Sequence, residues 1–402
     1  MMATRTSRQT PSILVALALC LALQMTGFVM ILPLFARRFE TFGSGVEALG
    51  MSAMVYALTS IVAAPCIGML TDRYGRRRII LISLAASVLA FSGYLFATSA
   101  WLLIVLRGLT GLFTAGLVPA MTSAVGDLAP ENRRAQWIGI LGGGASVGWI
   151  VGPIVGGLLY DHFDYVVPFA TAMSVELAAL LLAVFLIPET HWRSADHTHP
   201  AWTLGLLGRH ALPTLYLLML TTFGAMFAWA FIEPQFMFYA YDQLSWTSSQ
   251  LGLVMSTFGL ACMVGEFTLG QLSDRLGRKP VLVLGLALFS AQFVGLVMFH
   301  DVSWIVVSFL LAGLGNALYD PALNAYILDI TPPEQTGRIM GLKGTVGSLG
   351  NMLGPAALVL FTPILSPQGV FLIAAALLYM LTIAWGVGLR QPHVAEAAQG
   401  AH

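Results

Sequence analysis

The sequence predicts an all-α membrane protein with twelve transmembrane helices in two parallel six-helix repeats. Three observations support this fold class: an apolar composition, long apolar runs and an internal repeat. The chain has 402 residues, of which 57% are hydrophobic and 9% are charged, and its mean hydropathy is +0.82. A soluble globular protein carries roughly 25% charged residues. A soluble fold is therefore excluded, because so few charges cannot cover its surface.

Twelve apolar runs are long enough to cross a bilayer, whose core needs about 20 mostly apolar residues per helix. The first run follows Arg5 and Arg8, as in a signal peptide, but it is too long and no small-residue cleavage site follows it. We therefore expect it to be retained as a helix. The expected spans are 12–35, 46–70, 79–97, 101–125, 136–160, 166–187, 211–239, 248–270, 280–299, 303–328, 336–362 and 368–389.

The charged residues predict the orientation, because short cytoplasmic loops retain Lys and Arg. With the N-terminus inside, most of the 19 basic residues lie in cytoplasmic segments, and the outside loops hold only Arg37 and Arg38. Both termini are therefore expected in the cytoplasm. The net charge is zero, which argues against nucleic acid as a partner. Cys20, Cys66 and Cys262 have no clustered spacing, so neither a disulfide framework nor a metal site is expected.

The second half of the chain repeats the first at an offset of 202 residues, the separation of Gly68 and Gly270. Each half has an even number of spans, so both halves enter the membrane from the same side. We place one six-helix bundle at 1–187, a cytoplasmic linker at 188–210, and a second bundle with a short polar tail at 211–402. The same offset aligns Gly111 with Gly313, Asp127 with Asp329, Gly148 with Gly350, Gly152 with Gly354 and Pro153 with Pro355.

Two parallel halves with a binding site at their midplane interface are the plan of a secondary transporter that works by alternating access. His197 and His199 lie in the linker, where we expect them to be solvated rather than to bind a metal. Gly142 to Gly144 lie within a span and follow no strand, so they do not predict a nucleotide site. We therefore expect no cofactor and no enzyme activity, and a gradient must supply the energy.

Both halves carry the same loop motif after their second span. It comprises Gly68, Asp72, Arg73, Gly75 and Arg76 in the first half, and Gly270, Asp274, Arg275, Gly277 and Arg278 in the second. Glycine permits a tight turn, and the Asp can cap a helix or pair with an Arg. The motif resembles the loop signature of the major facilitator superfamily, although topology control alone would also attract arginines. The resemblance implies a gate at the inner end, to which Asp127 and Asp329 are expected to belong.

The fifth span is rich in small residues. They are Gly139, Gly148, Gly152, Gly156 and Gly157, and Pro153 lies among them. Small residues permit close approach of helices, and the proline removes a backbone hydrogen bond and bends the helix. This spacing resembles the antiporter signature of the drug:proton branch of the superfamily. The residues by themselves indicate only close packing, so a packing face without any direction preference is the alternative.

The first span, from Gln24 to Pro33, is similar to the first helix of tetracycline and multidrug exporters. Arg107 in the fourth span resembles the membrane-embedded arginine motif of the family. Those exporters usually carry an Asp where this chain has Gln24, and that carboxylate often serves cation recognition or proton coupling. The resemblance covers nearly the whole chain, and it implies a monomer surrounded by lipid in the bacterial inner (cell) membrane.

Five ionisable residues stand well inside the expected spans, where a charge is costly and by default marks a functional site. They are Arg107, Glu176, Glu233, Glu266 and Asp320. Arg107 keeps its proton at ordinary pH and must find an acceptor or a carboxylate, so structural pairing and proton coupling are both open for it. Lys343 lies near the cytoplasmic end of its span, where it can snorkel to the interface.

The four carboxylates have different expected roles. Glu233 precedes Pro234, where we expect a helix break that brings the carboxylate to cavity water and substrate; the alternative is an idle glutamate near the headgroups. Glu176 is midway along its span, so it faces inward or is protonated. Glu266 lies one helical turn before the loop motif, which favours pairing with that basic loop over transport chemistry. Asp320 resembles neither a known cap nor a ligand.

The sequence thus predicts a proton-coupled exporter of amphipathic, cationic or aromatic drugs, with protons and small molecules as its partners. Glu233 or Glu176 would bind a proton in competition with a cationic substrate, and Arg107, Gln24 and Asp320 would contribute to the site. One alternative is a dedicated transporter of a sugar, metabolite or lipid, which the absence of the usual Asp slightly favours. The other is a non-transporting sensor, against which the loop motif in both halves argues.

Overall fold

The computed structural model describes residues 3–130, 133–189, 212–269, 272–332 and 335–387. Within these residues, twelve helical segments are long and apolar enough to cross a membrane, and each coincides with an expected span. The all-α, twelve-span fold predicted from the sequence is therefore confirmed. The linker expected at 188–210 lies outside the described residues except for its first two positions.

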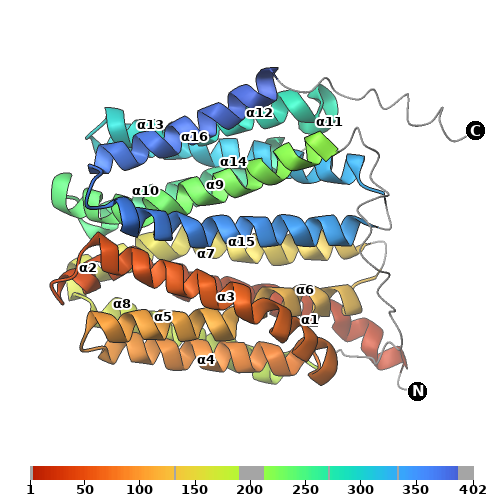
Figure 1. Cartoon of the computed structure of the whole chain (residues 1–402). Coiled ribbons are helices and arrows are strands. Elements are labelled where there is room, and N and C mark those ends of the chain that lie inside the picture. Colours follow the sequence, from red (N-terminus) through yellow and green to blue (C-terminus); the bar gives the residue numbers. More distant parts are fainter. Residues whose placement is uncertain (1–2, 131–132, 190–211, 270–271, 333–334, 388–402) are drawn as a thin grey trace, which may run out of the picture.

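The first half is entirely helical, and its helices run across the molecule in alternate directions (Figure 1). Its first and fourth spans are each divided into two helices. The helices are α1 (Ala3–Ile31), α2 (Leu34–Glu40), α3 (Val46–Tyr74), α4 (Arg76–Phe96), α5 (Ala100–Thr114), α6 (Leu117–Leu128), α7 (Arg134–Phe163) and α8 (Val166–Leu186).

The second half follows the same plan. Its seventh span ends in a short π-helix, and its ninth is divided. The elements are α9 (Leu212–Phe238), η3 (Tyr239–Gln243), α10 (Ser248–Leu269), α11 (Leu272–Leu276), α12 (Arg278–Phe289), α13 (Ala291–Met298), α14 (Val302–Ile330), α15 (Thr336–Phe361) and α16 (Pro367–Val387).

Proline acts differently in the first spans of the two halves. At Pro33 the chain turns between α1 and α2, because proline supplies no backbone N–H to continue the helix. Pro234 lies inside α9, which continues unbroken to Phe238. The helix break expected beside Glu233 is therefore wrong. The four residues from Pro234 to Met237 are all buried, so packing holds the helix together despite the lost hydrogen bond.

Equivalent glycines make equivalent contacts in the two halves, which gives the sequence repeat a physical meaning. A Cβ on Gly111 would collide with the carbonyl oxygen of Tyr56, and one on Gly313 would lie 2.5 Å from that of Phe258. These partners are also related by the repeat offset. Each glycine lets two helices of its own half approach more closely than any side chain would allow.

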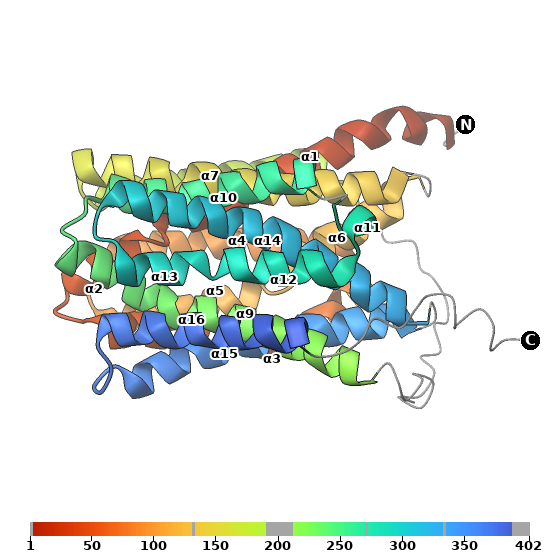
Figure 2. The same ribbon diagram turned by 90° about the horizontal axis from the view of Figure 1, so that it is seen from above.

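The glycines of α7 pack this helix against two neighbours. A Cβ on Gly152 would lie 2.9 Å from the carbonyl oxygen of Thr26 in α1, and a Cβ on Gly157 would collide with Ser248 at the start of α10. Gly148 and Gly156 also contact α1, whereas Gly139 faces open space. Helix α7 therefore joins the core of its own half to the second half, and Figure 2 shows it beside α10.

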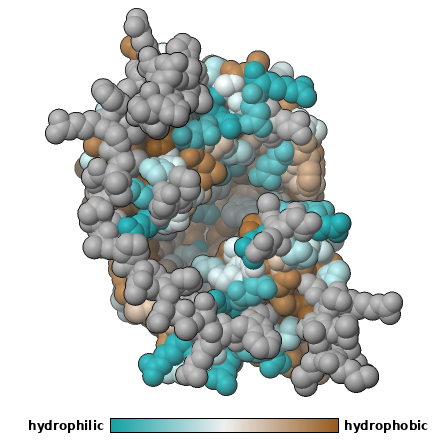
Figure 3. All heavy atoms as spheres, turned by 90° about the vertical axis from the view of Figure 1, so that its right-hand side faces the viewer, coloured by the Kyte–Doolittle hydropathy of each residue, from teal (hydrophilic) through white to brown (hydrophobic). Residues whose placement is uncertain are grey.

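The two halves meet at the end of the molecule opposite the start of α1. We call this the outer end, and the end where α1 begins and α16 ends the inner end, which is expected to be cytoplasmic. Asp161 of α7 accepts hydrogen bonds from the backbone N–H groups of Ser248 and Ser249, at 2.9 and 2.8 Å. The Tyr241 hydroxyl donates to the Pro33 carbonyl at 3.2 Å. At the inner end the molecule is hollowed between its halves (Figure 3), so this conformation is open at that end.

Replacing Gly157 by Leu is expected to open the outer end, because its side chain would collide with the backbone of Ser248. The readout is a Cys at Ala53, in a background where the three native cysteines are Ser, labelled with a membrane-impermeant thiol reagent added outside. We expect labelling about tenfold faster than in the parent. This factor corresponds to a loss of roughly 1.4 kcal/mol in the free energy that favours the closed outer end. Gly139→Leu, on the same helix but facing open space, is the control and should leave the rate unchanged.

Candidate functional site

The main candidate site is a cavity of about 550 Å³ between the two halves. Helices α1, α3, α5, α6 and α7 line it from the first half, and α9 and α15 from the second. Most of the lining is apolar or aromatic, and two residues carry charge. The lining residues are Phe28, Leu32, Ala53, Tyr56, Ala57, Ser60, Ile61, Ala64, Arg107, Thr114, Ala115, Val118, Trp149, Met226, Trp229, Ala230, Glu233, Ser348, Asn351 and Pro355.

Arg107 reaches this cavity from the middle of α5 and is 5% exposed. Its guanidinium carbon lies 4.8 Å from the ring centre of Phe35, 4.9 Å from that of Tyr56 and 5.5 Å from that of Phe28. Its Nε has no hydrogen-bond partner, and among the described residues no ion pair involves it. Three aromatic faces therefore compensate its charge in place of a carboxylate.

Glu233 lines the same cavity from the opposite half, on α9. It is partly buried, and Arg107 is the charged group that acts on it electrostatically. No ion pair joins the two residues in this conformation, so each charge remains available to a substrate. The cavity thus presents a cation on one half and a carboxyl group on the other.

Glu176 and Gln24 do not line this cavity. Glu176 on α8 is fully buried, and neither of its carboxylate oxygens has a hydrogen-bond partner. It packs against Gly27 of α1, where an added Cβ would lie 3.3 Å from its Cγ. One turn away on α1, Gln24 is 5% exposed and its Oε1 also lacks a partner.

Asp320 belongs to a polar cluster beside the main cavity. Lys343 on α15 donates hydrogen bonds to Asp320 Oδ1 at 2.7 Å and to Asn324 Oδ1 at 2.6 Å. Asn324 Nδ2 donates in turn to the other Asp320 oxygen at 3.0 Å. Instead of snorkelling, Lys343 thus forms an ion pair that lines a neighbouring cavity of about 280 Å³.

The expected pairing of Glu266 with the basic loop is not found. Among the described residues, no hydrogen bond or ion pair reaches its carboxylate, although the two residues after α10 are not described. The second-half loop arginine is engaged elsewhere: Arg278 pairs with Asp274 and, at 2.9 Å, with Asp329. Glu266 instead lines a third cavity, of about 250 Å³, between α7, α9, α10, α12 and α14.

The loop motifs lie at the inner end. Gly75 and Gly277 have φ angles of 98° and 90°, which favour glycine, so the expected tight turns are confirmed. Arg76 Nε lies 3.3 Å from Asp127 Oδ2, equivalent by the repeat to the pairing of Arg278 with Asp329. Gly68 faces open space and Arg73 and Arg275 are exposed, whereas Gly270 and the Asp72 side chain lie outside the described residues.

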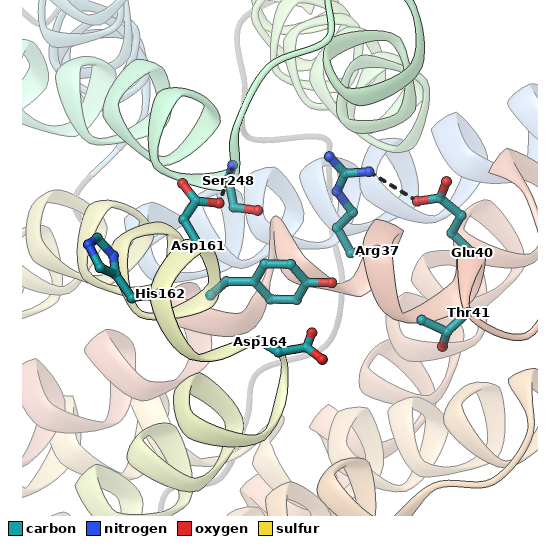
Figure 4. A pocket seen from close by; sticks show the side chains of 8 residues that line it. Arg37, Glu40, Thr41, Asp161, His162, Asp164 and Ser248 are labelled. Atoms are coloured by element: carbon teal, nitrogen blue, oxygen red, sulfur yellow. Dashed lines mark hydrogen bonds and ion pairs between the residues drawn. The ribbon is translucent and has the colours of Figure 1, made fainter.

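A polar depression of about 490 Å³ lies at the outer end, where the halves are closed (Figure 4). Arg37 in it forms an ion pair with Glu40 at 3.3 Å and stacks on the ring of Tyr241 from the second half, 4.0 Å from its centre. Asp161 faces Ser248 across the same depression. These contacts make it part of the closed outer gate, and a separate functional site is not needed to explain it.

Sequence reasoning missed several residues of these cavities. Asn324 lies four residues after Asp320, and this spacing on one helical face was a usable signal. Lys343 was set aside because of its place near a span end. Trp149 and Tyr319 gave no local signal, since an aromatic residue in a span is as often a packing or lipid-facing residue.

Comparison with known proteins agrees with this architecture. The family model described as Major Facilitator Superfamily matches residues 17–240 and again residues 218–401. The tetracycline resistance protein, class G, of Vibrio anguillarum is 30% identical over 89% of this chain and 92% of its own length. A multi-drug resistance efflux pump homolog of Lactococcus lactis is 27% identical over 81% of each chain.

Solved structures of transporters share the fold at lower sequence identity. A human organic anion transporter is 19% identical, with a TM-score of 0.70 over 94% of this chain and 99% of its own. The nucleoside transporter NupG is 15% identical, with a TM-score of 0.74 over 93% and 99%. These likenesses bear on the fold alone.

Replacing Lys343 by Met is expected to lower the stability of the purified protein by about 1 kcal/mol, because Asp320 keeps a charge without its cation; its partial exposure keeps the effect small. The double variant Asp320→Asn with Lys343→Met should recover most of this loss, since it removes both charges. Thermal unfolding in detergent measures both effects. An equal or larger loss in the double variant would contradict the pairing.

Proposed function

Because the chain belongs to the Major Facilitator Superfamily, a family of membrane transporters and not of enzymes, we propose that it exports amphipathic cationic or aromatic compounds in exchange for protons. It is an integral membrane protein with twelve spans, and its bacterial relatives support the cell membrane as its location. Several relatives are named as tetracycline resistance proteins or multidrug efflux pumps. Their names support drugs as the class of cargo.

The observation that carries the proposal is the placement of Glu233 and Arg107 in one cavity, on opposite halves. The rest of the lining is mostly apolar, with aromatic faces from Phe28, Tyr56 and Trp229. Such walls accept flat molecules of different shapes, and Met226 adds an adaptable surface. A single carboxylate among them selects positive charge.

In the inward-open state, an ionised Glu233 attracts a cationic substrate from the cytoplasm. The substrate occupies the position in which a proton would otherwise neutralise the carboxylate. Arg107 remains charged throughout, and opposite charges across the cavity attract each other. Substrate and proton therefore compete for one negative charge.

In the outward-open state, protonation of Glu233 removes that charge and the substrate leaves. The neutral carboxyl group then returns to the inside, where it releases the proton at the higher cytoplasmic pH. The loop pairs of Arg76 with Asp127 and Arg278 with Asp329 hold the inner ends within each half, and we assign the gate to them. Glu176, enclosed and apart from the cavity, serves the first half as a neutral packing group in this scheme.

The scheme implies further assignments. Both termini and the linker at 188–210 lie in the cytoplasm, the halves are 1–187 and 211–402, and a single chain suffices for transport. The glycines of α7 that face α1 and α10 allow the halves to rock without side chains between them. Lipid surrounds the outer faces of both halves.

Glu233→Gln is expected to reduce gradient-driven transport in proteoliposomes at least about tenfold, because the amide cannot bind and release a proton. Cationic dyes and neutral drugs are supplied under an imposed pH gradient, and accumulation is followed with and without a protonophore. Exchange of substrate without a gradient should persist in the variant. Glu47→Gln, an exposed residue at the first turn of α3, is the matched control and should behave as wild type.

Two outcomes would count against this function. Gradient-driven accumulation by Glu233→Gln at the wild-type rate would remove Glu233 from the coupling. Movement of none of the dyes and drugs by the wild type would favour a dedicated transporter of a physiological solute, which a metabolite screen would then identify.

A further inference from the structure

An aromatic side pocket adjoins the main cavity in the second half. Its volume is about 250 Å³, and it shares Trp149, Met226 and Trp229 with the main cavity. Phe258 and Phe289 complete its apolar walls. The rings of Trp229 and Phe258 are stacked, with centres 5.9 Å apart and planes inclined by 13°. The side pocket and the main cavity therefore share one wall, formed by Trp149, Met226 and Trp229.

Among the described residues that line this pocket, Glu266 is the only charged one, and it is exposed. In the described part of the chain, neither a hydrogen bond nor an ion pair neutralises it. The neighbouring carboxylate, Asp320, has Lys343 at 2.7 Å, and the like charges of Glu266 and Asp320 repel each other. Lys343 supplies a positive charge to Asp320, whereas no cationic side chain of the described residues pairs with Glu266. A cationic ligand in the pocket would supply that positive charge.

Tyr319 provides a second polar group that points to a ligand. The residue is 1% exposed, it lines the pocket, and its hydroxyl has no hydrogen-bond partner. A buried hydroxyl without an acceptor costs free energy. Asn316 also lines the pocket, and its Nδ2 donates to the sulfur of Cys262 at 3.5 Å. The pocket therefore presents a buried hydroxyl group and a carboxylate beside aromatic walls.

We propose that this side pocket is a second binding subsite, selective for aromatic cations, with Glu266 as the counter-ion and Tyr319 as a hydrogen-bond donor. Aromatic faces attract a cation through their quadrupoles, and a carboxylate adds a direct charge interaction. The inference rests on the proposed function, because it names a subsite and a cargo class for the same transporter. It makes Glu266 a specificity-determining residue that takes no part in proton coupling.

A matched pair of ligands tests the subsite by equilibrium binding to the purified full chain in detergent, followed by ligand fluorescence. N-methylacridinium is a permanent cation, and acridine has the same flat ring system but is neutral at alkaline pH and has a nitrogen that accepts a hydrogen bond. Glu266→Gln should weaken N-methylacridinium binding about tenfold and leave acridine binding nearly unchanged. Retained acridine binding also shows that the variant is folded.

Tyr319→Phe provides the reciprocal measurement, because it removes the donor but keeps the ring. It should weaken acridine binding several-fold and spare N-methylacridinium, whose nitrogen accepts no hydrogen bond. Unchanged N-methylacridinium affinity in Glu266→Gln, or an equal loss for both ligands, would overturn the subsite.

The two proposals can fail separately. Binding to the side pocket needs no gradient, so loss of selectivity in Glu266→Gln would stand even if the wild type moved nothing in proteoliposomes. In the converse case, the wild type shows proton-driven transport that depends on Glu233, while Glu266→Gln binds N-methylacridinium as tightly as the wild type does. That result would reject only the subsite.

Discussion

A charge held at membrane depth must be met by water, by an opposite charge, by aromatic faces or by a proton. Arg107 lies among three aromatic rings, and Asp320 pairs with Lys343. Glu176 is enclosed without a partner. Among the described residues, Glu233 in the main cavity and Glu266 in the side pocket form no ion pair, and our proposals assign proton exchange to the first and cation binding to the second.

The cavities owe their position to the packing of α7. Its glycines bring the helix against α1 and against the start of α10, where Asp161 accepts two backbone hydrogen bonds from the other half. This contact closes the outer end and leaves the inner end open (Figure 3). Because the contact consists of backbone surfaces and a few hydrogen bonds, it can separate at a modest cost in free energy, as alternating access requires. Within the second half, α15 packs against α9 as α7 packs against α1, and a Cβ on Gly354 would lie 2.7 Å from the Phe231 nitrogen.

Hydropathy and the repeat offset were sufficient to predict the fold, because apolar length and internal symmetry are properties of the sequence itself. The positive-φ turns at Gly75 and Gly277 followed in the same way from local motifs. The partners of the buried charged residues could not be predicted from the sequence, because they depend on side chains that the fold brings together from different helices. Glu266 shows this limit: its sequence neighbourhood favoured a basic loop, whereas the fold places it in an aromatic pocket. Pro234 shows a second limit. A single proline predicted a helix break, but the packing of its buried neighbours keeps α9 continuous.

Competition between a proton and a cation for Glu233 is the central claim, and proton release on binding tests it most directly. The purified protein in weakly buffered solution receives a cationic substrate identified by transport, and a pH indicator records the release. Release by the wild type and by Glu176→Gln, but not by Glu233→Gln, is the predicted result. Release that persists in Glu233→Gln and disappears in Glu176→Gln would contradict it, and would move the coupling into the enclosed site between α1 and α8.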